Sequence, residues 1–382
     1  KMWDEEMEVR YSGARRYVKR FDNIMQGIVN RELVLLQRGS LENLSLRQVK
    51  YRQNVLLDDD VEVQVSSISL NFRDVLNILG MYPGNPGAPG CEVSGVVTRV
   101  GKEVRELQIG DEVMGLGEGC LKEMVTLNQH HTHRKPSHLS MEEASTIPIV
   151  FGTVELALVE LCKLKQGDTI LIHAAAGGVG LTAIQYAKQI GARVVATASE
   201  GKHEYLKQLG VDLLSTSRDA NQFLEDINCM LGPNSIDVVL NSLSDDYRPF
   251  SFELLSPHGH FIEIGKRGIL SHEEAKSIRS DVEYHIVALD TLSTVEPQHF
   301  QRLLSSIYKR FEDGELCALP TNVFNFEREY GEAFQFLRQG KSIGKVVLKV
   351  DDAHRCQFPS AILGKTAGAY VITGGLGGLG LL

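Results

Sequence analysis

The residues with the clearest chemical meaning form a glycine-rich turn, AAAGGVG, at positions 174–180. No bulky side chain precedes Val179, so a pyrophosphate group can come close to the backbone N–H groups of the turn. Gly177 and Gly180 occupy the second and third glycine positions of the pattern G-x-G-x-x-G, and Ala175 replaces the first. The alternative is a plain glycine turn in an ordinary strand–helix–strand unit. We expect a dinucleotide to bind at Ala175, Gly177, Gly178, Val179 and Gly180.

The stretch Ser-Glu-Gly-Lys at positions 199–202 indicates which dinucleotide binds. Glu200 lies near the position where an acidic side chain accepts a hydrogen bond from the ribose of NAD. Ser199 and Lys202 suit the 2′-phosphate of NADP instead, and Arg218 can join them from the end of the next strand. Each cation can equally be a solvated surface charge. We predict NADPH as the cofactor, with NAD as the alternative.

Polar residues follow two further expected strands. Asn241 and Ser242 come after Ile236–Leu240, and Lys266 comes shortly after His260–Ile264. Ligands of a parallel α/β sheet bind at the carboxyl ends of its strands. We therefore expect these polar side chains to reach a cofactor or substrate.

A strand–turn–helix–strand unit must position the glycine turn. Thr169–His173 and Arg193–Ala198 have the pattern of buried strands. Between them, apolar residues recur every three positions on one face of an expected helix, and Gly191 stands where a helix C-cap glycine belongs. This unit has the length of a dinucleotide-binding motif.

Short strands dominate the first part of the chain. Asp60–Leu70 alternates like a half-buried strand, and Cys91–Val100 and Glu112–Leu116 follow it. Gly344–Val350 returns as a strand near the end, after the helical pattern of Gln298–Phe311. The sequence predicts an α/β protein: a doubly wound parallel-sheet (Rossmann) nucleotide-binding domain with a discontinuous, β-rich, barrel-like substrate domain.

The composition argues against several classes of partner. The 382 residues carry a formal net charge of −9, which disfavours general affinity for nucleic acid. No apolar run reaches membrane-spanning length. The six cysteines are scattered without a C-x-x-C pair, as is typical of reduced thiols. We expect a cytoplasmic protein with neither a nucleic-acid nor a membrane partner.

Four histidines lie in Asn128–His138, NQHHTHRKPSH. A metal cluster is one interpretation, but proline, lysine and arginine interrupt the stretch and no regular ligand spacing is present. A solvated loop is the favoured interpretation. The following residues, Leu139–Cys162, have a helical pattern with Ser140 as N-cap and Pro148 as an interruption.

Several motifs together carry a family resemblance. They are SLNFRDVLNILGMYPG, GCEVSGVVTRVG, GDEVMGL, IHAAAGGVGLTAIQYAK, IDVVLNSL, HFIEIGK and IGKVVL, spread from about Leu33 to Val350. The chain resembles the enoyl reductase domain of polyketide synthases and animal-type fatty acid synthases, in the medium-chain dehydrogenase/reductase superfamily. Its flanks, EVRYSGARRYVKRF and YVITGGLGGLG, resemble the end of the structural half of a ketoreductase and the start of its catalytic half. We therefore expect a piece of a longer polypeptide.

The resemblance gives a predicted division of the chain. Residues 1–32 are the flanking ketoreductase segment, and 33–150 are the first part of the substrate domain. Residues 151–289 form the NADPH-binding domain and 290–350 the return segment of the substrate domain. Residues 351–382 are a linker and the truncated start of a ketoreductase.

The resemblance also implies a reaction. Hydride passes from NADPH to the β-carbon of a trans-2-enoyl thioester on an acyl carrier protein, and the α-carbon is then protonated. A developing oxyanion needs a preplaced donor, and protonation needs a positioned acid. The implied partners are the acyl carrier protein, with its enoyl phosphopantetheine thioester, and neighbouring ketoreductase and other synthase domains. The oligomeric state is expected to follow that of the parent synthase.

Individual residues match functional positions of the family. Lys266 and Asp290 match the proposed proton-donor lysine and its acidic companion, although a solvated lysine is the plain alternative. Tyr82 matches a tyrosine that guides protonation at a methyl-bearing α-carbon in some modular synthases; the alternative is a packed loop tyrosine. Four further residues match positions near the nicotinamide or the cofactor: Asn71, Thr153, Asn241 and Lys345.

The resemblance implies that the chain is zinc-free. Zinc-dependent relatives carry Gly-His-Glu where this sequence has Gly90-Cys91-Glu92, and the Asn71 region replaces their early cysteine ligand. The four-cysteine structural lobe is absent. Two other functions stay open at this point: a free-standing zinc-free quinone or enone reductase, and a catalytically inactive structural domain of a synthase.

Overall fold

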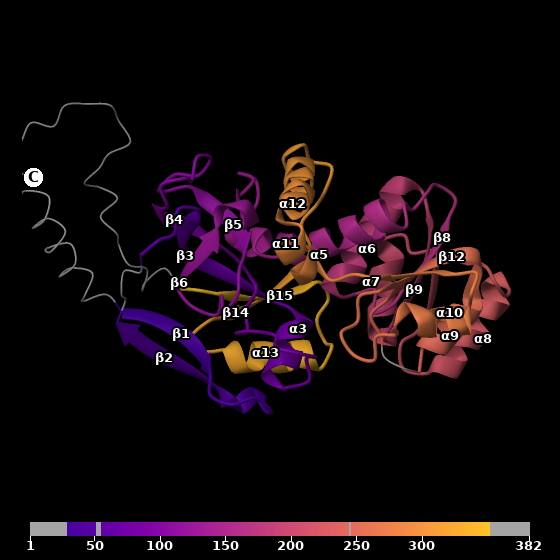
Figure 1. Ribbon diagram of the computed structural model, residues 1–382. Coiled ribbons are helices and arrows are strands. Elements are labelled where there is room, and N and C mark those ends of the chain that lie inside the picture. The colour runs from indigo at the N-terminus through magenta and orange to yellow at the C-terminus, as the bar shows by residue number, and fades with distance from the viewer. Residues whose placement is uncertain (1–28, 51–54, 244–245, 352–382) are drawn as a thin grey trace, which may run out of the picture.

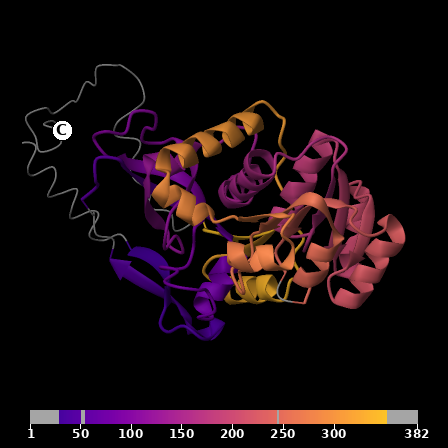
Figure 2. The ribbon, with the colours of Figure 1, turned by 45° about the vertical axis from the view of Figure 1, so that its right-hand side comes forward.

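The computed structural model describes residues 29–50, 55–243 and 246–351. The expectations for Glu8–Phe21, for the linker after residue 351 and for Ala369–Gly380 lie outside these residues. Two lobes stand side by side, with a seven-stranded sheet in one and a six-stranded sheet in the other (Figure 1). The view in Figure 2 shows the same two lobes, with helix α12 (Pro297–Glu312), in orange, across the top of the β-rich lobe and the middle of the molecule.

The six-stranded sheet is entirely parallel, as the sequence predicts for a Rossmann domain. Strand order reverses between β8 and β11, so the turns that follow these two strands open a crevice at the carboxyl edge of the sheet. In spatial order the strands are β10 (Leu213–Thr216), β9 (Arg193–Ala198), β8 (Thr169–Ile172), β11 (Ile236–Asn241), β12 (Leu255–Glu263) and β13 (Glu283–Ile286).

The expected helix after the glycine turn is α6, Gly178–Ile190. Leu181, Ile184 and Ala187 are buried on its inner face, and Gly191 ends it in the left-handed conformation with φ 87°. Both predictions for this segment are therefore confirmed. The other helices of this lobe are α7 (His203–Gln208), α8 (Ala220–Leu231), α9 (Arg248–Leu254) and α10 (His272–Ile278), with a short 3₁₀ turn at Glu200–Lys202.

The second lobe is the predicted β-rich domain. Its sheet has the order β14-β15-β3-β4-β5-β7, and β6 also pairs with β3. Residues from both ends of the described chain build it, because β15 pairs antiparallel with β3. The strands are β3 (Asp60–Leu70), β4 (Glu92–Val100), β5 (Glu112–Leu116), β6 (Met124–Asn128), β7 (Thr132–Arg134), β14 (Thr321–Asn325) and β15 (Lys345–Lys349); β1 (Val29–Leu35) and β2 (Leu44–Lys50) form a separate pair.

Strand β3 differs from its prediction as a half-buried strand. Nine of its eleven residues are buried, among them Glu62 and Ser66, at positions where alternation with Val61, Val63 and Val65 predicts a solvent face. The strand is central in the sheet, with β15, β4 and β6 paired along it. Tertiary cover therefore overrides the alternating pattern.

The region predicted as one interrupted helix is divided. Ser140 caps α4 (Met141–Ala144), and α5 (Ile147–Val154) follows with Pro148 in its first turn, where proline is tolerated. A π-helical stretch continues α5 over Glu155–Leu161. The remaining helices are α3 (Phe72–Ile78), α11 (Leu289–Val295) and α13 (Tyr330–Arg338), with short 3₁₀ turns at Leu41–Asn43 and Gln129–His131.

Helices α5 and α11 lie between the lobes in Figure 1. The expected domain divisions at 150/151 and 289/290 fall within these two helices. Phe151 of α5 packs in one apolar cluster with Ile184 of α6 and Phe300 of α12. The two lobes therefore share part of their core. The division into domains at these residues stays a prediction.

The histidine stretch is more ordered than a solvated loop. It forms the 3₁₀ turn Gln129–His131 and strand β7, and two of its histidines pack against α12. The His131 ring lies 5.0 Å from that of Phe300, and the His133 ring 4.7 Å from that of Tyr308. These rings are used for packing between the lobes.

Within the described residues, Cys91, Cys120, Cys162, Cys229 and Cys317 are free thiols. No helix in the described ranges combines the length and apolarity needed to cross a bilayer.

Candidate active site

A cavity of about 950 Å³ opens between the two lobes. Its walls come from the glycine turn, from the carboxyl ends of the parallel strands, and from β3, α3 and β15 of the other lobe. The cavity brings together most of the residues predicted from the sequence: Asn71, Thr153, Gly177, Gly178, Val179, Gly180, Ser199, Lys202, Arg218, Ser242, Lys266, Asp290 and Lys345. Three predicted residues, Tyr82, Ala175 and Asn241, are not part of its lining.

The glycine turn presents the N-terminus of α6 to the cavity. Gly177 is the N-cap, and no side chain accepts from the first N–H groups of the helix. These N–H groups carry the partial positive charge of the helix end, so they suit a pyrophosphate. The turn also connects the lobes, because Gly344 N donates to Ala176 O at 2.9 Å.

Two positions of the turn require glycine for different structural reasons. A Cβ on Gly178 would lie 2.6 Å from Cδ of Lys345, so this glycine leaves room for a side chain from the other lobe. A Cβ on Gly180 would lie 2.5 Å from the Ala175 backbone. Ala175 is itself fully buried, so its part in the turn is close packing against α6.

The contact of Gly180 gives a testable consequence. Gly180→Ala should lower the free energy of unfolding by roughly 1–3 kcal/mol, because the added methyl group meets backbone that cannot move aside. The matched control is Gly331→Ala in α13, where a Cβ meets nothing within 4 Å and which should be neutral or slightly stabilising. Thermal unfolding of both variants measures the difference. Equal melting temperatures would contradict the packing role of Gly180.

A positively charged corner lies beyond the glycine turn. Lys202 and Arg218 both line the cavity, and burial, together with the nearby Arg218, lowers the pKa of Lys202. Lys202 Nζ donates to the carbonyl oxygens of Gly340 and Ser342, at 2.7 Å each, and so is held in place by the loop before β15. Glu200 is exposed and is not part of the lining. An anion between the two cations would relieve their repulsion.

A buried polar group of the β-rich lobe borders the cavity through Asn71 and Lys345. Lys345 Nζ donates to Glu92 Oε1 at 2.8 Å, to Asn71 Oδ1 at 2.6 Å and to Leu70 O at 3.2 Å. Asn71 Nδ2 and the backbone N–H of Ile149 also donate to the Glu92 carboxylate. All three ammonium hydrogens of Lys345 thus have protein acceptors. Lys345 lines the cavity, and its charge is balanced by Glu92.

Four charged or polar side chains meet at a further wall, where Arg73, Lys266 and Asp290 line the cavity and Tyr82 lies behind them. Asp290 accepts a hydrogen bond from the Tyr82 hydroxyl at 2.9 Å, and its carboxylate lies 3.7 Å from Lys266 Nζ and 3.6 Å from Arg73 Nη1. The Arg73 guanidinium also lies over the Tyr82 ring, 5.2 Å from its centroid. Two cations face one carboxylate, so this wall of the cavity has an excess of positive charge.

The cluster shifts the proton affinities of its members. Burial lowers the pKa of Lys266, and Asp290 only partly opposes it. Burial acts to raise the pKa of Asp290, but Lys266, Tyr82 and Arg73 outweigh it and hold that pKa below its ordinary value. Burial also raises the pKa of Tyr82 to about 12. At neutral pH the cluster therefore holds a carboxylate, a neutral phenol and a lysine that releases its proton more readily than in water.

Comparisons with known proteins agree with this geometry. Residues 57–137 match the alcohol dehydrogenase GroES-like domain family, and residues 178–306 match the zinc-binding dehydrogenase family. The crystal structure of the CurK enoyl reductase is 36% identical, with a TM-score of 0.78, over 84% of this chain and 99% of that one. The chain belongs to the polyketide-synthase type of enoyl reductases, in the medium-chain dehydrogenase/reductase superfamily.

Other relatives of this enoyl reductase support the same family and fold. The mycocerosic acid synthase-like polyketide synthase of Mycolicibacterium smegmatis is 34% identical over 96% of this chain. That match covers 18% of the synthase, and the chain spans a fifth or less of the length of the first curated relatives. A mycobacterial structure complexed with NADPH is 24% identical, with a TM-score of 0.74, over 84% of this chain and 99% of that one. At that identity the likeness shows the fold alone.

The cavity of this enoyl reductase does not fit the zinc that the matched family is named for. Glu92 is already paired with the Lys345 ammonium. The Cys91 thiol donates to Asp74 Oδ1 at 3.6 Å, and burial, with Asp74 next, raises the pKa of Cys91 well above its ordinary value. Zinc binds the thiolate form. The absence of a catalytic zinc stays a prediction.

Asn241 differs from its expected position. It is the last residue of β11, one residue inside the strand end expected from the sequence, and its Nδ2 donates to Glu263 Oε2 at 2.9 Å and to Leu243 O at 3.0 Å, so it is not part of the cavity lining. The buried Glu263 carboxylate needs donors, and Asn241 supplies one between neighbouring strands. Ser242, the next residue, lines the cavity as expected, with its hydroxyl donating to His173 O.

Arg73 is the functional candidate that the sequence analysis does not single out. It lies in the first turn of α3, shortly after the end of β3, and faces the cavity. The signal available in the sequence is its place in NFRD, directly after a strand end. Its partner Asp290 is more than two hundred residues away, so only the fold shows the pairing.

Proposed function

We propose that this enoyl reductase reduces the double bond of a trans-2-enoyl thioester carried on an acyl carrier protein, with NADPH as hydride donor. The observation that carries the proposal is that the Lys266–Asp290 pair lines the same cavity as the helix terminus of the glycine turn. A proton donor and a dinucleotide site thus face one space. The polyketide synthases among the relatives support the substrate class.

The cofactor is held by this chain's own donors. The N-terminus of α6 binds the pyrophosphate, and Gly178 lets Lys345 pack beside it. Ser199, Lys202 and Arg218 bind the 2′-phosphate, and this supports NADPH over NADH. Asn71, Thr153 and Ser242 lie along the rest of the cavity and orient the nicotinamide. When bound, NADPH supplies the hydride that adds to the β-carbon.

The charged wall carries the second half of the reaction. As the β-carbon gains hydride, the electron pair of the double bond forms a new double bond between the α-carbon and the carbonyl carbon, and the carbonyl pair moves onto the thioester oxygen. The Lys266 ammonium, with Arg73 beside it, stabilises this oxyanion in a site with an excess of positive charge. Lys266 then gives its proton to the α-carbon and regains one from water. Asp290 positions Lys266, and Tyr82 positions Asp290 through its hydroxyl.

The carrier and the host assembly follow from the same proposal. The acyl chain arrives on the phosphopantetheine arm of an acyl carrier protein, and ketoreductase and other synthase domains are neighbours in one polypeptide. The short share of the curated relatives that the chain spans supports a domain of a larger synthase.

The proposal is tested by following NADPH oxidation with a crotonyl thioester and, separately, with a quinone. We expect turnover of the thioester to exceed that of the quinone by at least tenfold in kcat/KM. The reverse preference would replace the proposal with a quinone or enone reductase. NADPH binding without turnover of any carrier-bound enoyl thioester would favour an inactive structural domain.

A further inference from the structure

Three possible metal ligands lie on the outer part of the six-stranded sheet, away from the cavity. His260 is on β12, and Glu283 and His285 are on the edge strand β13. In the parallel register His260 stands opposite Glu283, and His285 is two residues further along the same strand. Because side chains alternate along a strand, Glu283 and His285 share one face. None of the three lines the cavity described above.

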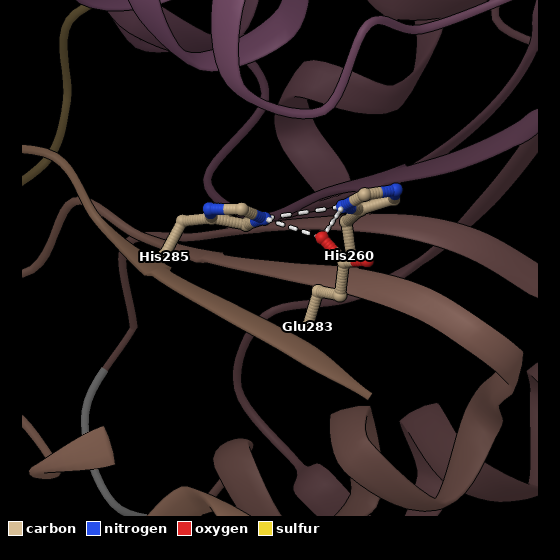
Figure 3. Close-up of side chains that lie close together, drawn as sticks. All are labelled: His260, Glu283 and His285. Atoms are coloured by element: carbon tan, nitrogen blue, oxygen red, sulfur yellow. Dashed lines mark hydrogen bonds and ion pairs between the residues drawn. The ribbon is translucent and has the colours of Figure 1, made fainter. Parts of the chain in front are cut away.

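The side chains converge on one point (Figure 3). His260 Nδ1 lies 3.1 Å from His285 Nε2. Glu283 Oε2 lies 3.6 Å from the former nitrogen and 3.7 Å from the latter. The imidazole side chains are 24% and 20% exposed, and the carboxylate side chain is 64% exposed. The group is therefore half-buried, with access for an ion from solvent.

We propose that His260, Glu283 and His285 form a binding site for a divalent transition-metal ion, and that Zn²⁺ fits it best. Ligands at 2.0–2.1 Å from a tetrahedral zinc are separated by about 3.3 Å, and the three observed separations bracket that value. Two imidazole nitrogens and one carboxylate oxygen are a donor set that zinc, copper and nickel accept, whereas magnesium and calcium prefer oxygen alone. Water completes the fourth position on the exposed side.

The bound ion would join the edge strand to its neighbour. Tyr284, between the two ligands of β13, points to the other face and packs near Phe252 and Phe261. That face is held by apolar contacts, whereas on the ligand face the contacts among the three side chains are the hydrogen bond between the two rings and the longer contacts of Glu283 with both rings. An ion that binds the folded state alone raises its stability by mass action. The site thus acts as a structural clip on the sheet edge.

The test is a calorimetric titration of the chelator-stripped chain with zinc chloride. We expect one ion per chain and a higher melting temperature with zinc. His285→Ala should weaken binding at least tenfold and abolish the rise in melting temperature. Glu283→Gln, at an exposed position, should also weaken zinc binding and reduce the rise in melting temperature, but by less. This variant tests the site if the histidine variant folds poorly. The matched control is His138→Ala, an exposed histidine elsewhere, which should bind zinc like the parent.

Absence of stoichiometric binding, or equal affinity in the parent and in both site variants, would overturn the proposal and leave a hydrogen-bonded histidine pair. The proposal also predicts that stripping the ion leaves the turnover rate unchanged, since the site lies outside the cavity. Turnover that is lost on chelation, and restored by zinc only when His285 is present, would overturn the structural role. This site departs from the expectation of a zinc-free chain without placing zinc at the reaction centre.

Discussion

Replacing Lys202 with alanine should raise the KM for NADPH by ~10- to 100-fold and leave the KM for NADH within about twofold, since a hydrogen bond to a charged group contributes ~1.5–3 kcal/mol. The side chain lines the cavity beside Arg218, and we propose that both cations bind the 2′-phosphate that only NADPH carries. Initial rates with each cofactor, on the parent and the variant, measure the split.

Lys202 has a second contact that the experiment must separate. Its ammonium also holds the carbonyls of Gly340 and Ser342, so Lys202→Ala loosens a loop as well. Arg218→Ala tests the proposed contact with the 2′-phosphate without loosening the loop, since no hydrogen bond from the Arg218 side chain to that loop is found in the described residues. Lys207→Ala, an exposed lysine of α7, is the matched control and should change neither KM. Equal use of NADPH and NADH by the parent protein would contradict the assignment.

The parts of the fold that follow from short-range rules could be predicted from the sequence. The glycine turn, the buried face of α6 and the C-cap Gly191 depend on residues within one strand–helix–strand unit. The return of β15 to the β-rich lobe is a longer-range feature, which the strand pattern of Gly344–Val350 after a helical stretch predicts and the family resemblance supports. Cover of the sheet faces is not local, and for this reason β3 is buried where alternation predicts exposure.

The candidate site also has features that the sequence predicts and features that only the fold determines. Residues at strand ends, such as Ser242 and Lys266, reach the cavity because the carboxyl edge of a parallel sheet is a fixed place. The direction of a side chain there is set by its neighbours, and Asn241, which donates to the buried Glu263, is not part of the lining. The group of His260, Glu283 and His285 depends on strand register, which no spacing in the sequence gives.

Lys266→Ala should lower kcat on an enoyl thioester by ~10²–10⁴-fold while the dissociation constant for NADPH changes little, because a positioned general acid contributes about that much. Water can replace the proton donor, so the loss is expected toward the lower end. Steady-state turnover and cofactor titration on the same preparation separate chemistry from binding. Lys276→Ala, an exposed lysine of α10, is the control and should keep the parent rate. Near-normal turnover, or failure of Lys266→Ala to bind NADPH, would show that the assigned role is wrong.

The pH profile shows whether Lys266 acts as an acid or only as a charge. The parent kcat should fall as pH rises through the Lys266 pKa, which burial places below the ordinary 10.5. Asp290 is the group that raises this pKa, while Arg73 lowers it. Asp290→Asn leaves two cations unbalanced, so its rate should fall and the alkaline limb should move to lower pH. Tyr82→Phe removes one hydrogen bond to Asp290 but no charge, so it should shift the limb less. An alkaline limb that stays in place in Asp290→Asn, or persists in Lys266→Ala, would assign that proton to another group.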